Sequence, residues 1–239
     1  MRQLEYSWAD LHIHTTASDG TATPREVVEY ACAHTDLRII AICDHNSVDG
    51  AHEAATIARD YPIEVIVGQE VESCEGHILG LWAPAAIAPG RSARETILEI
   101  HQQGGIAIAA HPFAPRWWHK HGLCRGEREI YDANEFDGVE CANSTPLLFL
   151  ANFHARGYWH RNRDRLAATG GSDAHMLEVI GTSRTQFPGT TPADLKRAIE
   201  ARTTRFHGPV WSLTRAWRYA RRAPEIRKRN AAMVKRQES

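Results

Sequence analysis

The sequence is poor in cysteine, and its cysteines do not form any recognisable framework. Its 239 residues include five, an odd number scattered without Cys-x-x-Cys spacing: Cys32, Cys43, Cys74, Cys124 and Cys141. Neither a disulfide scaffold nor a zinc ribbon is indicated. The N-terminus lacks the apolar segment of a secretory signal, and no apolar run approaches membrane-spanning length. These absences predict a reduced, cytoplasmic protein without membrane insertion.

Two common catalytic motifs are also missing. The sequence has no Gly-x-Ser-x-Gly and no P-loop, so it offers neither a serine nucleophile elbow nor a phosphate-cradling loop. With 43% hydrophobic and 24% charged residues the composition is otherwise that of a globular protein. The one excess is 14 histidines, which fits a metal enzyme. The length suits a single large α/β domain.

Positive charge is concentrated at the end of the chain. From His207 onward nine Lys or Arg face two Glu, a balance of +7, and because the whole chain carries −1 the residues before it carry −8. An acidic body is expected of a site rich in metal-binding carboxylates. The tail is interpreted as a basic amphipathic helix packed on the body, with nucleic-acid binding as a second interpretation.

The functional pattern begins in the first strand that the sequence predicts, at residues 9–15. Side chains of a strand alternate between its two faces, so His12 and His14 project together while Leu11 and Ile13 pack behind them. Asp19 follows after a short turn. Since neutral imidazole is the commonest metal ligand in proteins, this arrangement predicts the start of a metal site.

Four later apolar runs repeat this pattern of a strand followed by ligand-type side chains. They occupy residues 39–45, 63–70, 106–112 and 166–175, and they end in Asp44-His45, Glu70, His111-Pro112 and Asp173-Ala174-His175. In parallel α/β sheets and barrels the chemistry gathers at the carboxyl ends of the strands. Helices are predicted between these strands, with N-caps at Thr23, Ser92 and Thr191.

These motifs together resemble the successive motifs of the PHP superfamily, named for polymerase and histidinol phosphatase. The resemblance covers roughly residues 8 to 206 in the expected order. It implies an α/β fold, a distorted (β/α)7 barrel, over residues 1–206, with residues 207–239 as the basic C-terminal tail. It also implies up to three metal ions and phosphoester hydrolysis.

The resemblance further implies nine metal ligands in three groups. The first group is His12, His14, Glu70 and Asp173; the second is Glu70, His77 and His111, with Glu70 bridging; the third is Asp19, His45 and His175. Mixed imidazole and carboxylate ligands suit two or three divalent transition-metal ions, either zinc, manganese or iron.

Six residues that are not ligands are predicted to act at the site. Asp44 is interpreted as orienting His45 or a neighbouring ligand, and Arg184 as a catalytic contact to phosphate, with a plain surface arginine as the alternative. Substrate binding is predicted for Asn46, Arg116, Lys120, Asn143 and Arg184. Arg116 and Lys120 lie in a long polar stretch, residues 113–135, which we interpret either as a substrate-binding lid or as a packed surface loop.

The predicted activity is a metal-dependent phosphoesterase acting on a small phosphorylated metabolite or nucleotide, by attack of a hydroxide that bridges two ions. Three alternatives stay open: a metallohydrolase of carbamate-type esters, an exonuclease-like activity on short oligonucleotides, and a metal-stabilised binding module without catalysis. The sequence leaves the oligomeric state undetermined.

Overall fold

The fold is taken from a computed structural model that describes residues 5–114, 132, 135–208, 220, 221, 223–226 and 228. Arg116, Lys120, most of the stretch 113–135 and most of the tail from residue 207 lie outside the described residues. The predictions made for them therefore stay predictions.

One sheet organises the described part of the chain. Its nine strands lie in the order β7-β6-β5-β4-β3-β2-β1-β8-β9. Their bounds are β1 Tyr6–Ile13, β2 Ile39–Ile42, β3 Glu64–Ser73, β4 Gly76–Leu81, β5 Ile106–Ala109, β6 Gly138–Asn143, β7 Ala167–Gly171, β8 Arg184–Pro188 and β9 Arg205–His207.

The sheet curls until β7 meets β1. An isolated parallel bridge joins Ile13 to Ala174, and the amide of Asp173 donates to the carbonyl of His12 at 2.8 Å. The predicted distorted barrel of the PHP type is thereby confirmed as a nearly closed, barrel-like α/β sheet. The distortion comes from antiparallel pairs, since β4 runs against both β3 and β5, and β8 runs against β1. The strands β8 and β9 extend the sheet beyond the seven that were predicted.

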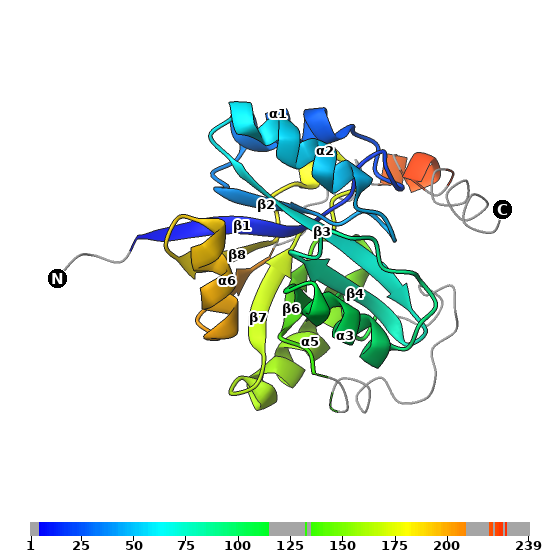
Figure 1. The fold of residues 1–239 in the computed structure, drawn as a ribbon, viewed down its shortest axis with the longest axis vertical. Helices are drawn as coiled ribbons and strands as arrows, with labels where there is room; N and C mark the ends of the chain where they lie inside the picture. The colour runs from blue at the N-terminus through cyan, green and yellow to red at the C-terminus, as the bar shows by residue number, and fades with distance from the viewer. Residues whose placement is uncertain are drawn as a thin grey trace.

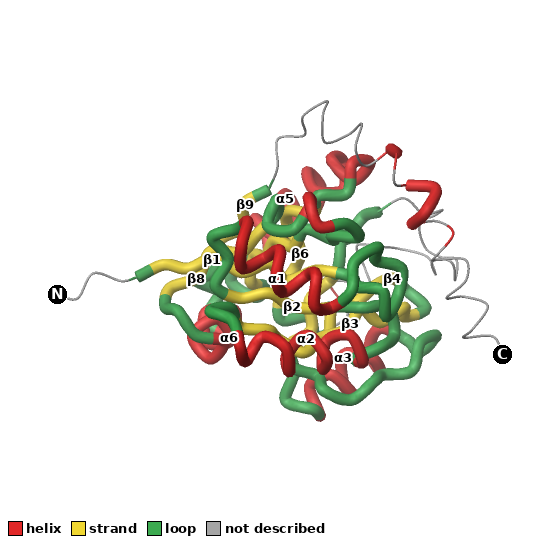
Figure 2. Tube along the Cα trace, turned by 90° about the horizontal axis from the view of Figure 1, so that it is seen from above, coloured by secondary structure: helices red, strands yellow, loops and turns green. Residues whose placement is uncertain are grey.

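Helices cover the outside of this sheet. They are α1 Pro24–His34, α2 Asp49–Ile57, α3 Ala93–Gln102, α5 Phe149–Asn162 and α6 Pro192–Glu200, with single 3-10 turns at Ala58–Asp60, Pro146–Leu148 and Leu177–Val179. In Figure 1, α1 and α2 lie together over one side, α3 and α5 lie on the opposite side, and α6 lies beside β1 and β8. Figure 2 shows the strands among the helices from a second direction.

Local sequence explains where three helices begin. The side chains of Thr23, Ser92 and Thr191 each accept a hydrogen bond from the backbone amide of the third helical residue. The carboxylate of that third residue in turn accepts a hydrogen bond from the backbone amide of the capping residue. All three predicted N-caps are confirmed. Such a cap contributes about 1 kcal/mol by satisfying amides that have no partner within the helix.

The apolar runs are continuous because both faces of their strands are buried. On β2, Ile40 and Ile42 pack in the cluster beneath α1 and α2, whereas Ile39 and Ala41 pack in the barrel interior. Residues of α6, including Leu195, join this interior cluster. The core thus fills the barrel and leaves the carboxyl ends of its parallel strands for polar side chains.

Candidate metal centre

The nine predicted ligands meet at one end of the barrel. Seven are buried, and two, His77 and His175, are slightly more exposed. Most lie in or just beyond the carboxyl end of a strand; β4 begins at this end because it is antiparallel. The set comprises His12 and His14 at the end of β1, Asp19 in the turn that follows, His45 after β2, Glu70 in β3, His77 in β4, His111 after β5, and Asp173 and His175 after β7.

Four of these residues form a compact set of donor atoms. His12 Nε2 lies 3.1 Å from His14 Nε2, 3.3 Å from Glu70 Oε2 and 3.6 Å from Asp173 Oδ1. His14 Nε2 lies 3.3 Å from the same glutamate oxygen and 3.2 Å from the same aspartate oxygen. Four tetrahedral ligands 2.0–2.2 Å from one ion have atoms about 3.3–3.6 Å apart. Of these residues, His12, His14 and Asp173 offer ligand atoms close enough to share one ion, whereas Glu70 groups with His45 and His77.

Glu70 turns its two carboxylate oxygens to different partners. Its Oε1 accepts from His77 Nδ1 and from His111 Nε2, both at 2.9 Å. Its Oε2 lies 3.3 Å from His12 Nε2, from His14 Nε2 and from His45 Nδ1. A carboxylate in this position can join two neighbouring ions, which is the role predicted for it.

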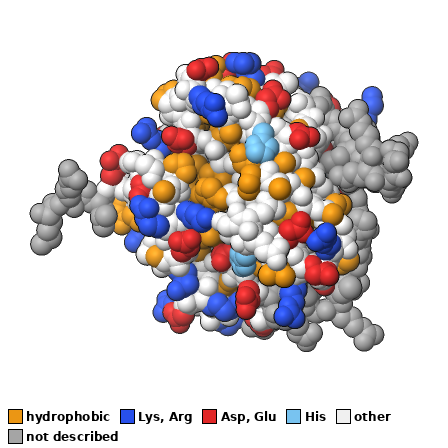
Figure 3. Space-filling view, in the orientation of Figure 1, with side chains coloured by type: hydrophobic (Ala, Val, Ile, Leu, Met, Phe, Trp, Pro, Cys, Tyr) orange, Lys and Arg blue, Asp and Glu red, His pale blue; other side chains and the backbone are white. Residues whose placement is uncertain are grey.

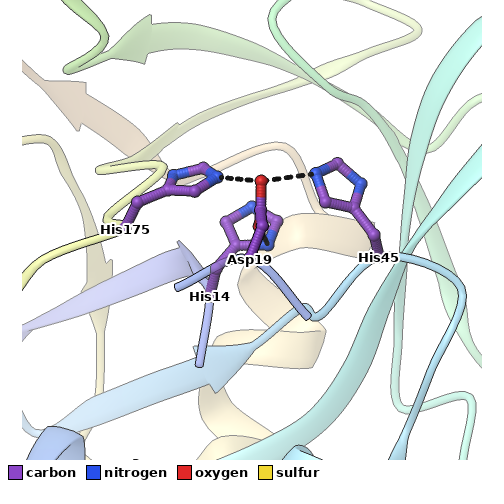
Figure 4. Close-up of side chains that lie close together, drawn as sticks. All are labelled: His14, Asp19, His45 and His175. Atoms are coloured by element: carbon purple, nitrogen blue, oxygen red, sulfur yellow. Dashed lines mark hydrogen bonds and ion pairs between the residues drawn. The ribbon is translucent and has the colours of Figure 1, made fainter. Parts of the chain in front are cut away.

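Asp19 lies between two histidines in a third group (Figure 4). Its Oδ2 is 3.1 Å from His175 Nε2 and 3.8 Å from His45 Nε2, and its Oδ1 is 3.8 Å from His14 Nδ1. These four residues offer ligand atoms close enough to share one ion. The imidazole of His14 therefore faces the first group with Nε2 and the third with Nδ1.

The histidines and carboxylates of the cluster shift one another's pKa values. Burial alone would lower the pKa of His175, but the carboxylates of Asp19 and Asp173 raise it to about 10. Burial likewise acts to raise the pKa of Glu70, but the surrounding histidines, His77 first among them, hold it well below its usual range. Imidazolium and carboxylate groups thus compensate one another, and binding a metal ion here would release protons.

The residues present fit a multinuclear transition-metal site. Within the described part of the chain, His14 Nδ1 and His45 Nδ1 are buried and make no hydrogen bond. Each faces a carboxylate oxygen, of Asp19 at 3.8 Å and of Glu70 at 3.3 Å, so a metal ion shared with these oxygens would satisfy both nitrogens. Imidazole and carboxylate donors mixed in this way favour zinc, manganese or iron over an all-oxygen calcium or magnesium cage.

The backbone around the cluster is constrained. His111 and Asp173 have φ angles of 27° and 54°, in a region of backbone conformation that residues other than glycine seldom adopt. A Cβ at Gly171 would lie 2.5 Å from His12 Cβ, and one at Gly20 would lie 2.6 Å from the carbonyl oxygen of His14. Such strained backbone angles are kept only where the surrounding structure holds the chain in place, and they are commonest at functional sites.

Asp44 holds the loop that carries Asp19. Its Oδ1 accepts from the Thr15 amide at 2.7 Å and from Ser18 Oγ at 2.6 Å, and its Oδ2 accepts from Thr15 Oγ1 at 2.7 Å. The predicted orienting role thus acts on the Asp19 loop rather than on the imidazole of His45.

The two predicted asparagines occupy different situations. Asn143 is fully buried, and its Nδ2 donates to Glu140 Oε2 at 2.9 Å and to Asp173 Oδ2 at 3.2 Å, so both amide hydrogens are engaged within the protein rather than with a substrate. Asn46 accepts from the Glu72 amide through Oδ1. Its Nδ2 is buried and has no hydrogen-bond partner among the described residues.

The structure does not bring Arg184 to the cluster. Its guanidinium lies 4.1 Å from the centre of the Trp8 ring and pairs with Asp36. Trp8 lies toward the amino end of β1 and Asp36 precedes β2, whereas the ligands gather at the carboxyl ends. The direction of the side chain, which the sequence could not supply, separates Arg184 from its predicted role.

Sequence reasoning missed Glu140. This carboxylate is 1% exposed, and its Oε1 lies 3.0 Å from His12 Nδ1. The available signal was a lone acidic residue between Val139 and Cys141 in an apolar strand, where a buried charge requires partners. Thr145 was also missed; its Oγ1 donates to Asp173 Oδ2 at 2.9 Å.

Surface features set few constraints on function. On the face drawn in Figure 3, the described acidic and basic side chains are interspersed, with hydrophobic side chains between them. A search of the described helices finds none with the length and apolar character needed to cross a bilayer.

A nearly closed α/β barrel whose strand ends gather a cluster of histidines and carboxylates is the arrangement of a class of metal-dependent hydrolases. The chain belongs to the PHP family within that class. The family model described as the PHP domain matches residues 10–165, and the model described as PHP-associated matches residues 149–204. The protein is accordingly a metal-dependent hydrolase of the phosphoesterase type.

Relatives with named activities match parts of the chain. The 5′-3′ exoribonuclease of Haemophilus influenzae is 43% identical over 76 residues, 30% of this chain and 27% of that protein. The 3′,5′-nucleoside bisphosphate phosphatase of Chromobacterium violaceum is 38% identical over 109 residues, 42% of this chain and 38% of that protein. The chain thus spans well under half of each.

A solved structure supports the fold over most of the chain. A two-domain protein from Bacteroides vulgatus, described as containing a predicted PHP-like metal-dependent phosphoesterase, superposes with a TM-score of 0.67 at 18% identity. It covers 86% of this chain and 66% of its own. At this identity the likeness concerns the fold alone.

Proposed function

We propose that the protein hydrolyses a phosphate ester of a small metabolite or nucleotide, with two or three zinc, manganese or iron ions held by the nine clustered ligands. The observation that carries this proposal is Glu70, whose two oxygens face two different sets of imidazoles. The related exoribonuclease and bisphosphate phosphatase are both named for cleavage of phosphate esters, which supports the same chemistry.

The chain's own residues bind and orient in this proposal. Bound ions would act as Lewis acids on a phosphoryl oxygen and make a water molecule more acidic. Asp44 holds the Asp19 loop in place, while Asn143 and Thr145 fix the carboxylate of Asp173. The amide nitrogen of Asn46, which has no hydrogen-bond partner among the described residues, would donate to an oxygen of a substrate that displaces the side chains covering it.

A thiol nucleophile is disfavoured at this site. Cys43 lies two residues before His45 but is fully buried, and burial raises the pKa of its thiol well above the usual value. A buried thiol that keeps its proton is a poor nucleophile. Activation of water is therefore the chemistry that these residues support.

The test compares metal-stripped protein with protein reloaded with zinc, manganese or iron. Substrates are an aryl phosphate, a nucleoside bisphosphate, a short RNA and a carbamate ester. We expect turnover of a phosphate ester only after reloading. Glu70→Gln should lower it by more than the about 10–100-fold that loss of an outer partner of a metal ligand costs. His101→Asn, in a histidine paired with Asp137 away from the cluster, should retain it.

Each other outcome has a defined meaning. Turnover that survives chelation, or that is unchanged in Glu70→Gln, contradicts the proposal. Hydrolysis of the carbamate ester alone would replace the phosphoesterase by the second enzymatic candidate, and cleavage of RNA alone would point to the exonuclease-like activity. Bound metal without turnover of any of the four substrates would favour the metal-stabilised binding module without catalysis.

A further inference from the structure

A buried carboxylate outside the nine ligands contacts two of them. Glu140 lies in the middle of β6 and is 1% exposed. Its Oε1 lies 3.0 Å from His12 Nδ1, and its Oε2 accepts from the backbone amide of His111 at 2.7 Å. Through Asn143, whose Nδ2 donates to both carboxylates, Glu140 is also linked to Asp173.

We propose that Glu140 is a positioning residue that sets the tautomer of His12, keeping the proton on Nδ1 so that Nε2 presents its lone pair to a metal ion. The inference rests on the metal binding described under the proposed function. His12 Nε2 faces His14 Nε2, Glu70 Oε2 and Asp173 Oδ1, all within 3.6 Å. An imidazole can donate to a metal from this nitrogen only if the other nitrogen holds the hydrogen, and a carboxylate beside that other nitrogen enforces this.

The partners of the second oxygen make the direction of these hydrogen bonds unambiguous. The amide of His111 can only donate. The Nδ2 of Asn143 is the donor side of that residue, because its Oδ1 accepts from the Thr145 amide at 2.8 Å. Glu140 Oε2 must therefore act as an acceptor, and Oε1 is left to accept from His12.

This asymmetry makes glutamine an informative replacement. In Glu140→Gln the amide oxygen must stay at the His111 amide and Asn143, so the NH₂ group turns to His12 Nδ1. That nitrogen then has to accept, and the hydrogen moves to Nε2, where it blocks the metal. The volume of the side chain hardly changes, so the substitution alters the tautomer while keeping the packing.

Glu140 and His12 pack closely against the backbone of Gly171. A Cβ on Gly171 would lie 2.7 Å from Glu140 Oε1 and 2.5 Å from His12 Cβ. The glycine of β7 thus allows the carboxylate and the imidazole to meet where the barrel closes. Glu140 connects ligands from β1, β5 and β7 from its own place in β6.

The chain offers a matched control. Asp137, just before β6, has a carboxylate oxygen 2.8 Å from His101 Nε2 that also accepts from the Ala107 amide at 2.7 Å. Asp137, like Glu140, thus contacts one histidine and one backbone amide, but it does so through a single oxygen and away from the cluster. Asp137→Asn should therefore leave metal binding unchanged.

The test measures metal affinity rather than turnover. Metal-free wild type, Glu140→Gln and Asp137→Asn are titrated with zinc or manganese against a competing chelator, and circular dichroism checks that each variant is folded. We expect the tightest ion to bind about 10–100-fold more weakly in Glu140→Gln and with wild-type affinity in Asp137→Asn. Glu140→Asp, which keeps the charge, should recover part of the loss.

A measurement on the wild type guards against a variant that fails to fold. Long-range ¹H–¹⁵N spectra of the zinc-loaded protein with labelled histidine should show the hydrogen of His12 on Nδ1. A hydrogen on Nε2, or unchanged affinity in folded Glu140→Gln, overturns the inference. A protein that binds metal in this way yet hydrolyses no phosphate ester contradicts the proposed function and leaves the inference standing.

Discussion

Replacing Gly171 with alanine tests the packing between β7 and β1. The new Cβ would lie 2.5 Å from His12 Cβ and 3.0 Å from the His12 amide nitrogen, and the backbone of β1 is held in place there by its pairing with β2 at Asp10 and Ile13. Overpacking of this kind costs about 1–3 kcal/mol. For a chain of this size each kcal/mol lowers the melting temperature by about 2–4 °C, so we expect a fall of about 2 to 12 °C.

A second glycine supplies a control for which the melting temperature should rise rather than fall. Gly157 lies within α5, and a Cβ there would meet Arg161 Nη1 at 3.6 Å, an ordinary contact. Alanine is favoured over glycine inside a helix by roughly 0.5–1 kcal/mol, so Gly157→Ala should raise the melting temperature.

The assay is thermal unfolding of the metal-free variants by circular dichroism, followed by metal titration. Gly171→Ala should also bind metal more weakly, because its Cβ displaces the imidazole of His12, whereas Gly157→Ala should bind as the wild type does. A Gly171→Ala protein that melts with the wild type and takes up the same metal would refute the close approach on which this reasoning depends.

Three further predictions concern other parts of the site. Asp44→Asn places an NH₂ group opposite the hydrogen-bond donors of the loop that carries Asp19. The substitution should lower the free energy of unfolding by about 1–3 kcal/mol, and elemental analysis should find one metal equivalent fewer. Arg184→Gln should leave turnover within about threefold of the wild type, since the guanidinium lies over Trp8, and a much larger loss would restore its predicted catalytic role. The Asp19 carboxylate, acting against burial, raises the pKa of His175 from 6.5 to about 10. The charged His175–Asp19 pair therefore contributes fully to stability below pH 6.5, and this contribution is lost as the pH rises through 10. Metal-free protein should melt at a lower temperature at pH 9.5 than at pH 6.5. Thermal scans of the metal-loaded protein should not show this difference.

Strand ends could be predicted from sequence because their signal is local. The run of β2, for example, is buried on both faces and ends at Ile42, three residues before His45. Parallel strands bring those ends together whatever the details of packing. The meeting of His12, Glu70, His111 and Asp173 in space follows from that rule, whereas their role as metal ligands stays a proposal.

Side-chain direction could not be predicted in the same way. Asn143 ends its strand as a pocket residue would, but its amide turns inward to Glu140 and Asp173. Arg184 turns to Trp8 because an aromatic face and a carboxylate are nearby on segments distant in sequence. Such choices depend on which neighbours the fold supplies, and no single stretch of sequence records them.

The position of β1 has a consequence for how the protein is made. Within this sequence β1 is synthesised before the other described strands, yet its neighbour β8 and the residues that bridge to it from the end of β7 come about 160 residues later. At roughly 5–20 residues per second, the first two histidines wait about 10–30 s for Asp173 and His175 to emerge. During that interval the edge of β1 is open and its imidazoles have only part of their coordination partners. Closure of the barrel and completion of the proposed ligand set therefore fall together, once the segment after β7 has been made.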